Sequence, residues 1–134
     1  MTTSSNRRAL QITLGVLSLI PALSGGAGLL VGQRALPGPR PSAVDPTLDS
    51  EYRVTSTFFF AAAPVIWASI PKIEQATGPL RTVAAAGFVA GIGRLLSWRT
   101  AGRPHPAYIA ATVLELVGMP ALVAWHEQVR RASR

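Results

Sequence analysis

Arg94 and Glu115 interrupt otherwise apolar stretches of this chain. A charge near the centre of a lipid bilayer costs about 2.5–3.5 kcal/mol, so such groups turn toward the protein interior and find partners. Arg94 lies shortly before Trp98, and Glu115 follows Pro106 within the next apolar stretch. At about 1.5 Å per residue the two side chains differ in depth by ~7 Å, which an extended arginine spans. The sequence therefore predicts an ion pair between two neighbouring helices.

Small residues share the helical faces of both charges, at steps of three and four. They are Gly87, Gly91 and Ser97 around Arg94, and Ala111, Thr112 and Gly118 around Glu115. Lipid gives helices no hydrophobic drive to associate, so close contact between small residues brings them together. We expect the Gly87/Gly91 pair, and the similar Gly28/Gly32 pair, to favour contacts inside one bundle over a dimer seam.

A second group of charged residues, at Asp49, Glu51 and Arg53, lies on the same predicted side of the membrane as Arg94. Two interpretations stand. In the first, all these groups form a structural polar network. In the second, they form a polar, ligand-binding pocket that opens outward, and its candidate residues are Glu51, Arg53, Arg94, Ser97 and Glu115.

The elements that position these residues are four apolar segments. The chain has 134 residues, of which 49% are hydrophobic and 14% are charged, with a mean hydropathy of +0.31. Spans of about 20 residues cross a bilayer, and in lipid the backbone must satisfy its own hydrogen bonds as a helix. The predicted spans cover residues 9–31, 54–70, 80–98 and 107–125, with a proline-rich outer loop at 33–50. Short remaining loops make neighbouring helices antiparallel. We expect one domain over 1–134, an all-α integral membrane four-helix bundle.

Positive charges near the span ends predict the orientation. Seven Lys and Arg residues fall on the side of the termini: Arg7, Arg8, Lys72, Arg81, Arg130, Arg131 and Arg134. Five fall on the other side: Arg34, Arg40, Arg53, Arg99 and Arg103. Both termini are therefore predicted to be cytoplasmic, in a multi-pass protein of the inner cell membrane.

Several functional classes are disfavoured. The net charge is +7, but the charges lie at the ends of apolar segments, where lipid head groups and topology explain them better than nucleic acid does. No cysteine exists, which excludes thiol chemistry. The two histidines form no set of metal ligands, and no nucleophile–base pair or phosphate loop stands out. We expect no catalytic residue, no metal and no enzymatic activity.

The chain resembles a bacterial family of four-helix membrane proteins of unknown function that is related to the DoxX/DoxD-like superfamily. Four stretches carry the resemblance: Asp49-Ser50-Glu51-Tyr52-Arg53, Gly91-Ile92-Gly93-Arg94-Leu95-Leu96-Ser97, Gly102-Arg103-Pro104 and Leu114-Glu115-Leu116. The resemblance implies a four-helix fold in the cytoplasmic membrane. Some DoxX-like proteins accompany membrane redox or quinone-linked systems, but a shared fold does not transfer a reaction.

Three functions are compatible with these features. The first is an accessory bundle that binds another membrane protein, with the Arg94–Glu115 network holding its fold. The second is a binder of a lipid or quinone-like ligand that supports a membrane redox system, with no other cofactor. The third is a small transporter that works as a homodimer and uses Glu115 as a proton carrier. The lipid bilayer is a partner in all three.

Overall fold

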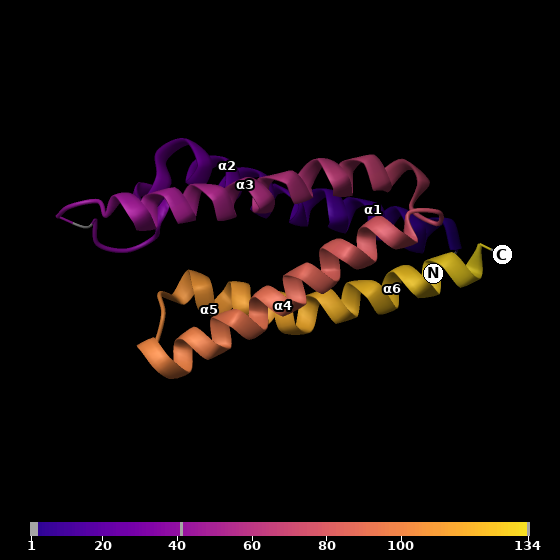
Figure 1. The fold of residues 1–134 in the computed structure, drawn as a ribbon. Coiled ribbons are helices and arrows are strands. Elements are labelled where there is room, and N and C mark those ends of the chain that lie inside the picture. The colour runs from indigo at the N-terminus through magenta and orange to yellow at the C-terminus, as the bar shows by residue number, and fades with distance from the viewer. Residues whose placement is uncertain (1–2, 41, 134) are drawn as a thin grey trace.

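The computed structural model describes residues 3–40 and 42–133, which form four long helical segments (Figure 1). Pro41 of the predicted loop and Arg134 of the predicted positive side lie outside the described residues. The segments are, in order, α1 (Thr3–Leu17), α2 (Leu19–Val31) and η1 (Gly32–Ala35); α3 (Pro46–Ser69) and η2 (Ile70–Lys72); α4 (Thr77–Ala101); and α5 (Pro106–Val113), η3 (Leu114–Gly118) and α6 (Met119–Ala132).

Four helical stretches of the described chain are long and apolar enough to cross a membrane: Ser4–Ala35, Pro46–Lys72, Thr77–Ala101 and Pro106–Ala132. The described residues contain no strand. These findings confirm the all-α fold with four apolar segments, and they indicate a membrane protein.

The second segment begins earlier than the sequence predicted. Helix α3 starts at Pro46, so the end of the expected loop at 33–50 is helical. The Asp45 carboxylate accepts a hydrogen bond from the backbone N–H of Leu48 (2.9 Å), and Pro46 occupies the first helical turn. A capping acid followed by proline is a strong helix start. Asp49 and Arg53 therefore lie on a helix.

Prolines account for two irregularities within the long segments. The first segment breaks at Ser18, between α1 and α2, where Pro21 has no N–H to donate to the carbonyl group of Leu17. The Ser18 hydroxyl, which is fully buried, accepts a hydrogen bond from the indole of Trp67 on α3 (2.7 Å). The fourth segment is π-helical over η3, directly before Pro120.

Both termini and the turn between α3 and α4 lie at one end of the bundle, which we call the terminal end (Figure 1). The buried apolar core lies here, and α1, α3, α4, α6 and the turn between α3 and α4 contribute its residues. These are Leu10, Leu14, Ile66, Ile73, Ala76, Leu80 and Val129. The other end, the loop end, holds residues 36–40, 42–45 and 102–105. Toward it the α2–α3 pair separates from the α4–α5 pair (Figure 1).

Polar contacts also join the helices at the terminal end. The buried ring of His126 on α6 lies with its Nε2 atom 2.6 Å from the carbonyl oxygen of Ile73, in the turn before α4. The indole of Trp125 donates to the side-chain oxygen of Asn6 (2.7 Å). Arg7 on α1 forms an ion pair with Glu74. The terminal end is therefore tied by apolar and polar contacts alike.

The Arg7–Glu74 pair predicts a pH dependence of stability. Burial alone raises the pKa of the Glu74 carboxyl, but hydrogen bonds from its own backbone N–H and from Arg7 hold that pKa below its usual 4.5. Its contribution is therefore complete above pH 4.5 and is lost as the pH falls through the lower folded value. Glu74→Gln should lower the melting temperature in detergent at neutral pH, and the difference from wild type should shrink on acidification below 4.5.

The matched control is Glu51→Gln, which removes the same charge from an exposed position on α3. Its melting curve should follow that of the wild type at every pH. A Glu74→Gln deficit that stays constant down to strongly acidic pH would contradict the ionised pair.

Candidate functional site around Arg94 and Glu115

Arg94 and Glu115 form an ion pair between α4 and η3, as the sequence predicts. The Arg94 Nε donates to the Glu115 Oε2 at 2.8 Å. The Glu115 side chain is only 7% exposed, whereas the Arg94 side chain is 31% exposed. The carboxylate is thus enclosed by the bundle, and the guanidinium lies between the interior and the surroundings.

Two tyrosines complete the site, and the sequence reasoning missed both. The guanidinium carbon of Arg94 lies 5.1 Å from the centre of the Tyr108 ring, a cation–π distance. Tyr108 on α5 interacts in turn with Tyr52 on α3. Tyr108 precedes Glu115 by seven residues, which is two helical turns. This spacing places the two side chains on one face of a helix, and it could have identified Tyr108 from the sequence. The pair of tyrosines links the two helix pairs that separate toward the loop end.

Gly91 allows the close approach that the ion pair needs. A Cβ atom at Gly91 would lie 2.9 Å from the Cβ of Glu115 and 2.9 Å from the Cδ2 of Leu116. One turn earlier, a Cβ at Gly87 would lie 3.2 Å from the Cγ of Met119. The Gly87/Gly91 pair therefore serves contacts inside the bundle.

The second glycine pair packs in the same way on α3. A Cβ at Gly28 would lie 2.1 Å from the Ser56 Oγ, and one at Gly32 would lie 1.9 Å from the Asp49 Oδ1. Both pairs are thus occupied within one chain, as the favoured interpretation expects.

Glu115 lies in the π-helical stretch η3, where the backbone N–H of Met119 reaches back to the carbonyl oxygen of Leu114. Single π turns inside α-helices are frequent at functional sites. The absent N–H of Pro120 removes the bond that an α-helix would make to the Leu116 carbonyl. Glu115, the buried carboxylate of the site, therefore lies on a turn whose backbone departs from α-helical geometry.

The other predicted site residues lie apart from this pair. Arg53 donates to the Asp49 carboxylate (2.7 Å) and to the carbonyl oxygens of Leu29 and Leu30 (2.8 and 2.9 Å). Glu51 and Ser97 are exposed. The structure therefore brings together Arg94 and Glu115, and it places Arg53 in a separate cluster at the C-terminal end of α2.

The guanidinium of Arg94 is only partly used. A guanidinium carries five N–H donors in a planar fork. Within residues 3–40 and 42–133 the Nη1 and Nη2 atoms of Arg94 have no hydrogen-bond acceptor, and Nε alone is engaged. The same part of the chain has no group of three or more metal-ligating side chains. The chemistry available here is hydrogen bonding to an acceptor oxygen, next to aromatic rings.

These features define a small helical bundle of membrane-protein type with a polar site between α4, α5 and η3. The chain belongs to the family described as domain of unknown function DUF4345, whose model matches residues 9–126 and so covers all four helical segments. No curated protein and no solved structure matches the chain.

The contact at Gly91 predicts a cost for any added side chain. Gly91→Ala should lower the free energy of unfolding by about 1–3 kcal/mol, the usual cost of overpacking, because Glu115 and Leu116 must move. Gly93→Ala is the matched control, since nothing lies within 4 Å of a Cβ there. It should be neutral or slightly stabilising through helix propensity. Titration with sodium dodecyl sulfate in mixed micelles, followed by circular dichroism, measures both; equal losses would contradict the close approach.

A double-mutant cycle tests the ion pair itself. Glu115→Gln should destabilise the bundle by about 1–3 kcal/mol, because it leaves a charged donor without its ionised acceptor. Adding Arg94→Gln should recover part of this loss, since two amides can bond to each other. The same mixed-micelle unfolding measures the coupling. Additive losses, with no recovery in the double variant, would show that the two side chains do not stabilise each other.

Proposed function

We propose that this protein is a non-enzymatic membrane bundle that binds an amphipathic ligand, a quinone-like molecule or a lipid, through Arg94. The observation that carries the proposal is the partial use of the guanidinium. Its Nε is held by the buried Glu115, whereas its two terminal nitrogens have no acceptor among the described residues and the side chain is 31% exposed.

Unpaired donors in hydrocarbon are costly, because the bilayer core supplies no water to satisfy them. A ligand oxygen that accepts a hydrogen bond removes this cost. Quinone carbonyls and phospholipid phosphates or ester carbonyls share that chemistry. Glu115 holds the guanidinium in place, which reduces the ordering cost that the ligand must offset. The ring of Tyr108 supplies flat apolar surface beside the donors, and Tyr52 interacts with Tyr108.

The proposed kinship with the DoxX/DoxD-like superfamily supports the quinone-like alternative, since some of its members accompany quinone-linked membrane systems. We propose for this chain an accessory role in the cytoplasmic membrane, with both termini inside, because positive charge is denser at the terminal end. In such a role the protein holds its ligand for a partner enzyme and does no chemistry of its own.

Mass spectrometry of the purified protein tests the proposal. Wild-type protein extracted in mild detergent should retain a small molecule, and fragmentation distinguishes a quinone from a phospholipid. Arg94→Gln should lose that molecule, because a shorter, neutral amide replaces the charged planar fork of donors. Arg94→Lys should retain less of it, since an ammonium group keeps the charge but lacks the planar fork.

Arg99→Gln is the matched control, an exposed arginine near the end of the same helix, and it should retain the ligand fully. Wild-type protein that is empty in repeated preparations, and that binds neither a short-chain benzoquinone nor phosphatidylglycerol when these are added, would contradict ligand binding. The Arg94–Glu115 pair would then be a structural contact.

A further inference from the structure

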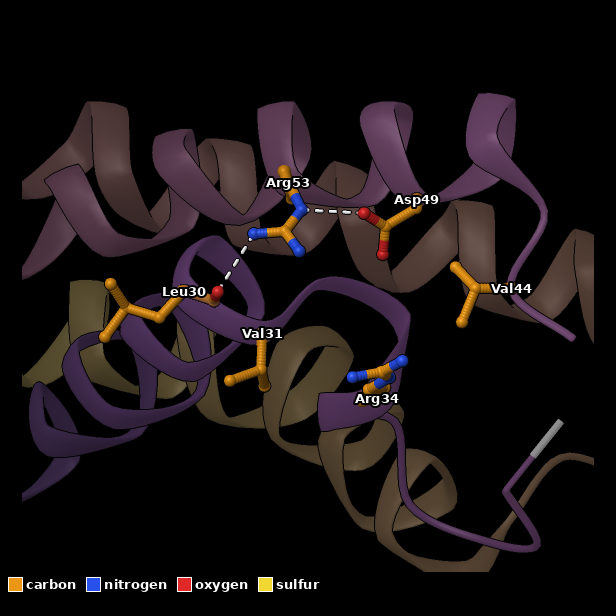
Figure 2. Close-up of a pocket in the computed structure, with 6 residues that line it drawn as sticks. All are labelled: Leu30, Val31, Arg34, Val44, Asp49 and Arg53. Atoms are coloured by element: carbon orange, nitrogen blue, oxygen red, sulfur yellow. Dashed lines mark hydrogen bonds and ion pairs between the residues drawn. The ribbon is translucent and has the colours of Figure 1, made fainter.

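A second polar site lies at the loop end, in a pocket of about 360 Å³ between the C-terminal end of α2 and the start of α3 (Figure 2). Its lining residues are Leu30, Val31, Arg34, Val44, Asp49 and Arg53. The volume is at the small end of the range for ligand pockets, about 300–1,000 Å³. It suits a head group, and a whole lipid would not fit.

The charges within this pocket do not cancel. Arg53 and Asp49 neutralise each other at 2.7 Å, and the second carboxylate oxygen of Asp49 accepts a hydrogen bond from the backbone N–H of Gln33 (2.8 Å). Both carboxylate oxygens of Asp49 thus have a partner, one on α3 and one on η1. Arg34 remains, exposed and without an ion-pair or hydrogen-bond partner among the described residues. The pocket therefore presents one uncompensated positive charge.

The apolar part of the lining continues toward the membrane-spanning part of α2. Leu30 is 77% exposed and Val31 is 47% exposed, in the last turn of an apolar helix. Arg34 follows them at steps of four and three, so the three side chains lie near one another along the chain's path out of the membrane. Figure 2 shows Val31 and Arg34 on neighbouring turns below the Arg53–Asp49 pair. A cation that follows exposed aliphatic side chains along the helix is complementary to a phospholipid, whose phosphate lies next to its acyl chains.

We infer that this pocket is a binding site for an anionic phospholipid, distinct from the Arg94 site. Arg34 binds the head-group phosphate, and Leu30 and Val31 contact the first part of an acyl chain. The Arg53–Asp49 pair keeps its place by bonding to the last carbonyls of α2, and Gly32, with a φ of 60°, provides the room for the Asp49 carboxylate. The site is therefore built by fixed contacts between α2 and α3, and only Arg34 is free to bind.

Native mass spectrometry of the delipidated full chain, titrated with phosphatidylglycerol or phosphatidylcholine, tests this inference. The wild type should bind phosphatidylglycerol more tightly. Arg34→Gln should weaken that binding about fivefold, the usual effect of one basic residue at a lipid surface. Arg103→Gln removes the same charge from the exposed α4–α5 loop and should leave the affinity unchanged. In the mild-detergent extract Arg34→Gln should still retain the molecule held by Arg94, so the two proposals can fail separately.

Three results would overturn the inference. Equal affinity for the two lipids would show that charge is not recognised. Equal weakening by Arg34→Gln and Arg103→Gln would show a general attraction to a basic protein. If inorganic phosphate alone displaced phosphatidylglycerol and raised the melting temperature as much, the occupant would be a free anion and not a lipid.

Discussion

The ion pair between Arg94 and Glu115 is the contact on which the arrangement of the α4 half of the molecule depends. A bilayer interior offers these groups no water, so each charge is tolerated only while the other is near. That requirement holds α4 against η3 in one register. Gly91 permits the required distance, since a Cβ atom there would come within 2.9 Å of Glu115. The absence of a side chain at Gly91 is thus a requirement of burying this carboxylate against α4.

The two ends of the bundle are held together by different means. At the terminal end, residues from four helices form an apolar core, and His126, Trp125 and Arg7 add polar ties between helices. Toward the loop end the helix pairs separate, and the tyrosines at positions 52 and 108 connect them. The bundle is therefore packed by four helices at the terminal end and divides into two helix pairs toward the loop end. Polar groups that face outward on those helix pairs are accessible from the lipid, whereas the core residues are not.

The four-helix fold could be predicted from the sequence because few physical rules govern membrane helices. Length and hydropathy locate the four segments, and the cost of a lone charge in lipid predicts that Arg94 meets Glu115. The predictions were incomplete where local backbone geometry determines the structure. The capping of α3 by Asp45 turned part of an expected loop into helix and carried Arg53 toward the end of α2, away from Arg94. The π turn depends on packing and proline together, and no pattern of hydropathy reveals it.

The site is assigned to Arg94 because its guanidinium makes fewer hydrogen bonds to the protein than that of Arg53. Arg53 donates from Nε to the Asp49 carboxylate and from Nη1 to two backbone carbonyls, so the protein engages two of its three nitrogens. Its role is structural, and it closes the end of α2. Arg94 gives the protein one hydrogen bond and one ring contact. Further hydrogen bonds from Arg94 to the protein, like those that Arg53 makes through Nη1, would hold the helices together more strongly. The two open nitrogens beside a buried carboxylate are therefore the basis on which we propose a ligand at Arg94.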